Sequence, residues 1–265
     1  MQAPPRLTDR AALLAHRRRA RPAALFLHDL ARAEVEERLT EVNRTFTRPA
    51  VVTPFPEIWT PLLPEARVVP DDPVLHLEEG AHDLVVHALC LHWADDPVGQ
   101  LVQARRALAP DGFLLAVTFG GRTLADLRAA LGVAEVKLRG GLSPRVLPMA
   151  DIRDLGSLLQ RAGLALPVAD SFQQTVLYRD LPHLLHELRS MGESNALLAR
   201  DRRIPPRALF TQAAAAYPTN AEGFLPAVFE LVMLSGWAPH PDQPLPLRPG
   251  SAAMRLADAL KPPDD

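Results

Sequence analysis

The stretch from residue 82 to residue 121 constrains the fold of this chain more than any other. It opens with the continuous apolar run HDLVVHALCL, which is typical of a parallel strand covered on both faces. A helix is expected next, because Asp96 can cap its N-terminus and Pro97 suits the first helical position. The tripeptide PDG then turns the chain into a second apolar run, FLLAVTF. Strand, helix and strand in this order predict a βαβ unit, and therefore an α/β protein with a parallel sheet.

Similar patterns continue on both sides of this unit. Residues 1–47 are predicted to form an N-terminal helical segment, with helix over 8–46, and residues 48–265 the sheet-containing domain. A loop is expected at 139–148, and residues 198–217 are expected to form a helix, a break and a second helix. The remaining predicted strands are 50–52, 68–69, 175–178 and 225–237, and the remaining predicted helices are 123–131, 149–163 and 181–191.

Charge and hydropathy weigh against several functional classes. The formal net charge of −2 and the isoelectric point near 6.5 give no reason to expect a nucleic-acid partner or an anionic membrane. No apolar run reaches the ~20 residues that span a bilayer, and no signal-like core opens the chain, so a cytoplasmic protein is predicted. The run HRRRARP at 16–22 is interpreted as a solvated helix face rather than a transit peptide or a basic patch.

The cysteine and the histidines carry little functional signal. Cys90 is the single cysteine, which rules out an intrachain disulfide and fits a reducing compartment. Its apolar surroundings favour a buried side chain over a catalytic thiol. No third carboxylate ligand is fixed by the spacing of the neighbouring histidines, so we predict no metal site. These histidines are His76, His82, His87 and His92.

The βαβ unit resembles the second half of a class I S-adenosylmethionine (SAM) methyltransferase, with an acidic residue opening the fourth strand and a PDG turn before the fifth. Three later stretches sharpen the resemblance: GGLSPRVLPMADIRDLGSLLQRAGLALPVADS, LHELRSMGESNAL and FELVMLSGWAPHPDQPLPLRPGS. Together with LHDLARAEVEERLTEVNRTF near the N-terminus, they are similar to the methyltransferase-like family of NADH:ubiquinone oxidoreductase complex assembly factor 5 and its alphaproteobacterial relatives. A more distant similarity is to the malonyl-acyl-carrier methyltransferase of biotin synthesis.

This resemblance implies a Rossmann-like sheet of seven strands, with a hairpin-like last strand at 225–234 that is antiparallel to its neighbour. It also implies a helical cap built from segments near 139–150 and 181–220. SAM is the implied cofactor, and a respiratory-complex subunit or its assembly helper is the implied protein partner. The mitochondrial member hydroxylates an arginine of a complex I subunit rather than methylating, so the reaction type stays open.

The chain departs from the family where the first strand should run into a glycine-rich SAM loop. Glycines there let the backbone approach the cofactor, and the following helix N-terminus supplies free N–H groups. The equivalent stretch here is AVVTPFPEIWTPLLPEARVV, which is degenerate because proline has no N–H to donate and a fixed φ. The prolines concerned are Pro54, Pro56, Pro61 and Pro64.

The same stretch is too short for the family path. The segment VVPDDPVLHLEEGAHDLVV matches the family's third strand and its approach to the fourth, which leaves only 50–67 for everything between the first and third strands. One βαβ unit alone takes about 30 residues, so we predict a sheet that lacks the first crossover helix and the second strand. The acid that would hold the ribose hydroxyls then has no position, and only Glu57 or Glu65 could replace it.

The resemblance nevertheless implies a set of site residues. It places Asp71 near the adenine amino group and the end of the fourth strand along the cofactor pocket, although Asp71 and Asp72 suit a turn equally well and Trp93 suits the core. Loops after strand ends are implied to contact substrate, with loop anchoring as an equal alternative. The predicted cofactor-binding residues are Asp71, Asp72, His87, Ala88, His92 and Trp93, and the predicted substrate-binding residues are Arg122, Thr123, Ser143 and Arg145.

Three functions remain open from the sequence. The first is a SAM-dependent methyltransferase, or a related hydroxylase-like enzyme that modifies a protein arginine. The second is a non-catalytic binding or assembly module. The third is an enzyme that acts on another small ligand. Micromolar binding of SAM needs about 8 kcal/mol, and each hydrogen bond lost with the glycine loop removes on the order of 1–3 kcal/mol. We therefore expect the family fold with impaired or lost SAM binding.

Overall fold

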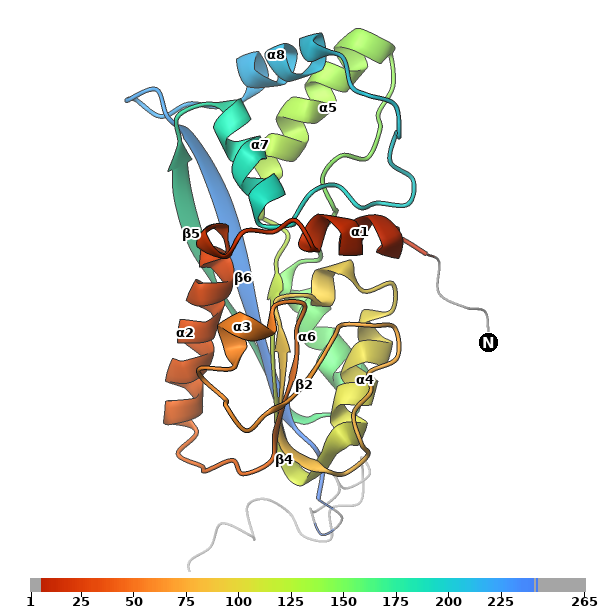
Figure 1. Ribbon diagram of the computed structural model, residues 1–265, viewed down its shortest axis with the longest axis vertical. Helices are drawn as coiled ribbons and strands as arrows, with labels where there is room; N and C mark the ends of the chain where they lie inside the picture. Colours follow the sequence, from red (N-terminus) through yellow and green to blue (C-terminus); the bar gives the residue numbers. More distant parts are fainter. Residues whose placement is uncertain (1–5, 241, 243–265) are drawn as a thin grey trace, which may run out of the picture.

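The structure is a computed structural model that describes residues 6–240 and residue 242. Its described part contains one mixed sheet with the strand order β2-β1-β3-β4-β6-β5. The first four strands run parallel, whereas β6 is antiparallel to both of its neighbours (Figure 1). The strands are β1 (Pro49–Val52), β2 (Arg67–Val69), β3 (His82–Ala88), β4 (Leu108–Phe119), β5 (Ala165–Tyr178) and β6 (Leu225–Trp237).

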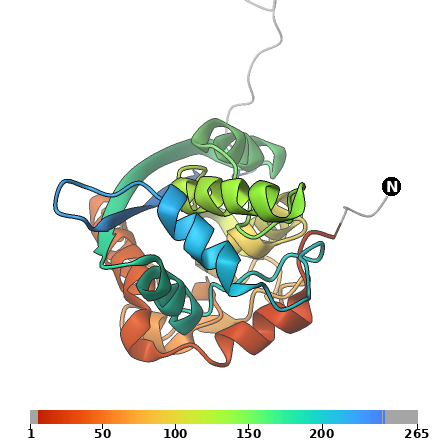
Figure 2. The same ribbon diagram turned by 90° about the horizontal axis from the view of Figure 1, so that it is seen from above.

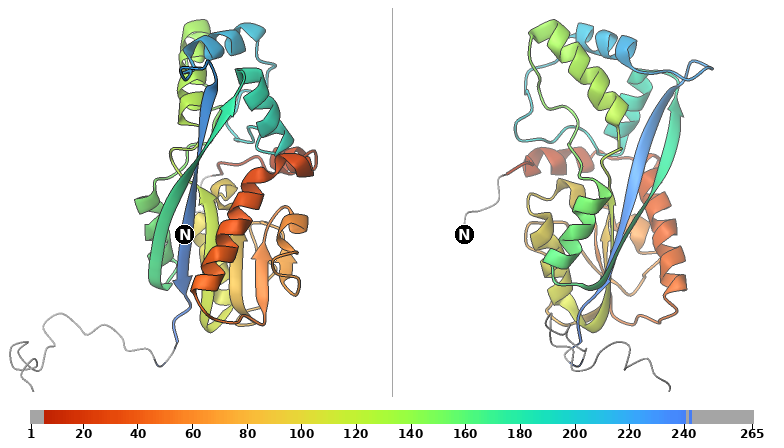
Figure 3. Two further views of the ribbon diagram at one scale, coloured as in Figure 1. Left: turned by 90° about the vertical axis from the view of Figure 1, so that its left-hand side faces the viewer. Right: turned by 180° about the vertical axis from the view of Figure 1, so that it is seen from behind.

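Helices cover both faces of the sheet (Figure 3). Because strand side chains alternate between faces, Val51, Leu84 and Val86 pack with α2 in one core, while Ala50 and Val85 pack with α4 and α6 in the other. None of the described helices is long and apolar enough to cross a membrane. The helices are α1 (Arg10–Arg17), η1 (Pro22–Ala24), α2 (Phe26–Glu41), α3 (Pro56–Trp59), η2 (Leu91–Trp93), α4 (Pro97–Ala107), α5 (Ala125–Arg139), α6 (Ile152–Arg161), α7 (Leu181–Ser190) and α8 (Arg207–Ala216).

A helical cap stands beyond the carboxyl ends of the parallel strands (Figures 1 and 2). It consists of α5, α7 and α8, and the long ribbon of β5 and β6 extends past the rest of the sheet to reach it. Thr123 ties the start of α5 to this ribbon, because its hydroxyl donates to the Glu230 carbonyl at 3.1 Å and accepts from the Glu230 N–H at 3.0 Å. The cap therefore overhangs the edge of the sheet at which parallel α/β sheets bind ligands.

The shortening of the sheet is confirmed, and the seven strands implied by the resemblance are corrected to six among the described residues. Strand β2 pairs directly with β1 in parallel, with Ala50 opposite Arg67 and Val52 opposite Val69. Only the single-turn helix α3 lies between them. The 14 residues between β1 and β2 are too few for a crossover helix and a further strand, as the sequence length predicted.

Several element boundaries differ from those predicted. The helix expected over 8–46 is interrupted between α1 and α2, where Pro22 opens the 3₁₀ turn η1. The strand expected at 175–178 is the end of the much longer β5, whose half-exposed residues and internal Pro167 weaken the strand pattern. The first helix expected within 198–217 does not form, and Pro205-Pro206 immediately precede α8. The proline-rich stretch PHPDQPLPLRPG, for which the sequence predicts a surface position, begins at Pro239 and lies mostly outside the described residues.

Candidate functional site

The loop between β1 and α3 offers no free backbone N–H group to a ligand. Its Thr53 N–H donates to the Val69 carbonyl at 3.0 Å, and the Phe55 N–H donates to the Thr53 hydroxyl at 3.1 Å. Pro54 and Pro56 have no N–H, and the chain contains no glycine before Gly80. A groove of about 520 Å³ does lie along this loop, but these prolines and apolar side chains form much of its wall.

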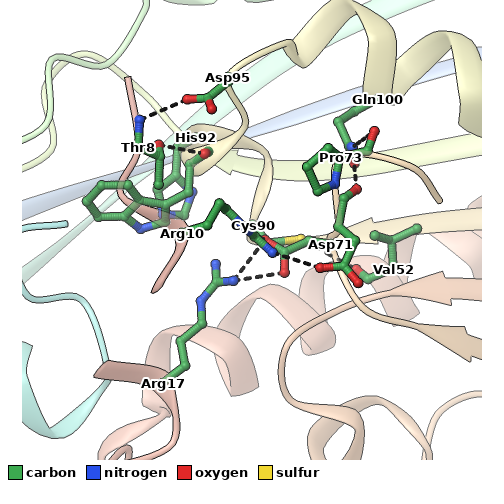
Figure 4. A network of polar contacts seen from close by, with 12 residues as sticks. Thr8, Arg10, Arg17, Val52, Asp71, Pro73, Cys90, His92, Asp95 and Gln100 are labelled. Carbon is green, nitrogen blue, oxygen red and sulfur yellow. Dashed lines mark hydrogen bonds and ion pairs between the residues drawn. The ribbon is translucent and has the colours of Figure 1, made fainter. Parts of the chain in front are cut away.

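The carboxylate of Asp71, expected at the cofactor, is bound instead by arginines of α1 (Figure 4). One guanidinium nitrogen of Arg17 lies 2.8 Å from each Asp71 oxygen, and Arg10 adds a contact at 3.2 Å. The Arg17 and Asp71 side chains are only 4% and 5% exposed. Burial raises the pKa of Asp71, but the two arginines outweigh it and hold the pKa below its usual range. Asp72 is more exposed, and its Oδ1 accepts a hydrogen bond from the Arg10 guanidinium at 3.2 Å.

His87 and Ala88, at the end of β3, are fully buried beneath this ion pair. The His87 ring nitrogens lie 3.2 Å from Gln100 Oε1 and 3.5 Å from Cys90 Sγ. Gln100 in turn donates to the Asp72 carbonyl at 2.8 Å, so this polar network is internal. Burial lowers the pKa of His87 and raises the pKa of Cys90 well above its ordinary value. Cys90 therefore has the environment of a structural rather than a nucleophilic thiol.

His92 and Trp93, in η2, converge on a carboxylate that the sequence did not single out. The indole N–H of Trp93 donates to Glu193 Oε2 at 2.7 Å, and His92 Nε2 lies 3.4 Å from the same oxygen. Burial raises the pKa of Glu193, but His92, Arg17 and Trp93 outweigh it and lower the pKa to about 2. Glu193 is consequently ionised at neutral pH.

Glu193 lines an apolar pocket of about 220 Å³ between the sheet and the cap, which we call the cap pocket. Two predicted substrate residues, Thr123 and Arg145, also line it. Arg145 is neutralised there by an ion pair with Glu135, which is 2% exposed. The apolar wall is formed by Leu27, Phe119, Leu124, Leu127, Leu131, Val146, Leu147, Met149, Leu185, Leu188, Met191, Phe210 and Phe229, with Trp93.

The other two predicted substrate residues lie outside the lining of the cap pocket. The Arg122 side chain is exposed, and the Arg122 backbone N–H donates to Glu230 Oε2 at 2.9 Å. The Ser143 hydroxyl accepts from the Asp201 N–H at 3.3 Å. Both contacts anchor loops of the cap. In the described part of the chain, no group of three or more His, Cys, Asp and Glu residues is arranged to hold a metal ion.

Sequence reasoning misplaced Arg17 and missed Glu193. The run HRRRARP was interpreted as a solvated face, which holds for Arg18 and Arg19 but not for Arg17, which is 6% exposed. Its burial follows from Asp71, 54 positions away, which local periodicity cannot reveal. Glu193 follows Gly192, whose φ of +84° ends α7 in a turn that only glycine adopts readily. An acid directly after such a helix end was the available signal.

Comparisons with known proteins agree with this architecture. No protein-family model matches the chain. The chain is 32% identical to "Arginine-hydroxylase NDUFAF5, mitochondrial" of Danio rerio, over 87% of this chain and 73% of that protein. It is 34% identical to the malonyl-acyl-carrier-protein O-methyltransferase of Xylella fastidiosa, over 68% of this chain and 59% of that protein. In the mammalian NDUFAF5 proteins the match spans 58–59% of their length. The YcgJ protein of Bacillus subtilis has the same fold, with a TM-score of 0.50 at 10% identity, over 79% of this chain and 98% of YcgJ.

Proposed function

Because the chain belongs to the methyltransferase-like family that includes NDUFAF5 and the malonyl-acyl-carrier-protein O-methyltransferases, we propose that it keeps this fold as a protein-binding module that does not use SAM. The partner we propose is a protein of respiratory-complex assembly, by its relation to NDUFAF5. The observation that carries the proposal is the buried ion pair of Asp71 with Arg17. It occupies the carboxylate that a cofactor would need.

The residues around the carboxyl ends of β1 and β2 do not fit SAM. Both N–H groups of the loop that follows β1 are already paired, at Thr53 and Phe55. Glu57 is the single unpaired acid along the groove, and it is exposed. Separating Arg17 from Asp71 would cost about 3–5 kcal/mol, a large part of the about 8 kcal/mol that micromolar binding requires. We therefore assign no chemical step to SAM.

Calorimetric titration with SAM and S-adenosylhomocysteine tests this proposal. We expect no binding to the wild-type protein at concentrations up to about 1 mM, which corresponds to less than about 4 kcal/mol. Two carboxamide variants serve as a matched pair: Asp71→Asn at the buried acid and Asp72→Asn at its exposed neighbour. Micromolar affinity that Asp71→Asn abolishes and Asp72→Asn preserves would overturn the proposal.

A second candidate function, the recognition or modification of a protein arginine, is favoured by Glu193. This carboxylate is ionised in an apolar pocket with the aromatic rings of Trp93, Phe119 and Phe229 nearby, and such surroundings attract a guanidinium group. Of the two arginines that line the pocket, Arg145 is neutralised by Glu135, and Arg189 is exposed, so that solvent and salt screen its charge. The name of the relative NDUFAF5 refers to an arginine hydroxylase, which is consistent with this candidate.

An arginine-containing peptide and the same peptide with citrulline, which is neutral and of similar shape, separate this candidate from a purely apolar pocket. We expect at least roughly tenfold tighter binding of the arginine peptide, because it forms a charge-assisted contact with Glu193. Glu193→Gln should remove the preference, whereas Glu222→Gln at an exposed turn should leave it unchanged. Equal binding of both peptides to the wild-type protein would contradict the candidate.

A further inference from the structure

Four exposed arginines gather where the core meets the cap, and we call them the arginine ridge: Arg18, Arg19, Arg21 and Arg189. The first three follow the end of α1, and Arg189 lies in the last turn of α7 (Figures 1 and 2). The two segments are in contact, because the Arg21 N–H donates to the Ser190 carbonyl at 2.8 Å. The ridge is therefore one surface although its members are up to 171 positions apart.

The charge of the ridge is not neutralised within the described part of the chain. None of its four side chains forms a hydrogen bond or an ion pair with another described residue, whereas Arg10 and Arg17 on the same helix are paired with acids. The sequence has no acidic residue between Arg10 and His28. With a net charge of −2, the chain is not basic overall, so the ridge is a local concentration of positive charge.

The ridge borders the cap pocket. Arg189 itself lines that pocket, beside Leu185, Leu188 and Met191. A ligand that spans both features must offer anionic oxygens to the guanidinium groups and an apolar or cationic group to the pocket. A peptide segment combines an acidic side chain with an apolar or cationic one within a few residues.

We propose that the arginine ridge docks an acidic segment of a partner protein, which places a neighbouring side chain of that segment in the cap pocket. Arginine suits this task because its planar donors meet a carboxylate in two parallel hydrogen bonds. With a formal net charge of −2, the chain has no overall positive field to attract a long polyanion such as a nucleic acid, whereas a short acidic segment meets only the ridge. This inference rests on the proposed function as a protein-binding module.

The test uses the full chain and a fluorescent acidic peptide that alternates Glu with Leu. A ridge variant carries Arg18→Glu, Arg19→Glu, Arg21→Glu and Arg189→Glu together. Its matched control reverses four exposed arginines at other sites, with the same change of net charge: Arg48→Glu, Arg67→Glu, Arg106→Glu and Arg161→Glu. Circular dichroism and thermal unfolding confirm that both variants are folded.

We expect the wild-type protein and the control variant to bind the peptide alike, and the ridge variant to bind it at least roughly tenfold more weakly, as expected when several charge-assisted contacts become repulsive. Binding to the wild-type protein should also weaken with added salt. If both variants bound the peptide equally weakly, net charge alone would explain the effect, and the proposal would be overturned. Tighter ridge-dependent binding of single-stranded RNA or of anionic vesicles would overturn it as well. The SAM titration measures binding of a nucleoside and the peptide titration measures binding of an acidic segment, so a failure of the proposed function and a failure of this inference are distinguishable.

Discussion

One guanidinium nitrogen of Arg17 lies 2.8 Å from both carboxylate oxygens of Asp71, and both side chains are buried. The pair joins α1 to the loop after β2 and fixes α1 across the carboxyl ends of the parallel strands. Burying two charges is costly, and the Nε and second terminal nitrogen of Arg17 lack hydrogen-bond partners among the described residues. The pair is therefore held in place by its mutual attraction and by the packing of α1.

Removing the arginine of this pair should destabilise the protein strongly. In Arg17→Met, Asp71 is left as a buried charge with only Arg10 nearby, and we expect a loss of about 3 kcal/mol in the free energy of unfolding. Urea denaturation at neutral pH measures it. Arg18→Met, at the exposed neighbouring position, serves as the control and should change stability by less than about 0.5 kcal/mol.

The double variant Arg17→Met with Asp71→Asn closes a mutant cycle. Because it removes the stranded charge, it should recover a substantial part of the stability lost in Arg17→Met. Additive losses in the double variant would show that the two side chains do not interact, contrary to the geometry.

Because of Glu193, the free energy of unfolding should decrease in acid. Its pKa is about 2 in the folded protein, against an ordinary value of 4.5, so the unfolded chain takes up a proton first as the pH falls. Its contribution, roughly 3 kcal/mol, is complete above pH 4.5 and is lost as the pH falls toward 2. Glu193→Gln should show a shallower decline of the unfolding free energy across this window. An unchanged acid profile in this variant would show that Glu193 is not ionised in the fold.

The elements that the sequence predicted well are those set by local pattern. The continuous apolar runs of β3 and β4 and the cap of α4, where Asp96 accepts from the Gly99 N–H at 2.8 Å, need no distant partner. The absence of a strand between β1 and β2 followed from chain length alone. The burial of Arg17 and the convergence of Trp93 on Glu193 depend on residues up to 100 positions away. Such pairings are set by tertiary packing, which the periodicity of a single segment does not contain.

The burial of Cys90 predicts a thiol that does not react in the folded protein. Its side chain is 1% exposed, and its raised pKa leaves almost no thiolate at neutral pH. Because the chain has a single cysteine, a thiol-specific disulfide reagent reports on this site directly. We expect no labelling under native conditions and one equivalent in denaturant. Rapid labelling of the native protein would contradict the buried placement.

The buried His28 should cause a second loss of stability in acid, which begins at a higher pH than the loss caused by Glu193. This side chain is 4% exposed and packs edge-on against Phe55, and its Nδ1 has no hydrogen-bond partner in the described part of the chain. Burial lowers its pKa to about 3, so below pH 6.5 the unfolded chain binds a proton that the folded protein does not bind.

Because of His28 alone, the free energy of unfolding should fall by about 1.4 kcal/mol per pH unit between pH 6 and pH 4. His28→Leu removes the titrating group and should flatten the profile in that window while leaving the loss below pH 4.5 caused by Glu193. Thermal unfolding followed between pH 7 and pH 4 distinguishes the two groups, and a His28→Leu profile parallel to the wild type would show that this histidine titrates as it does in water.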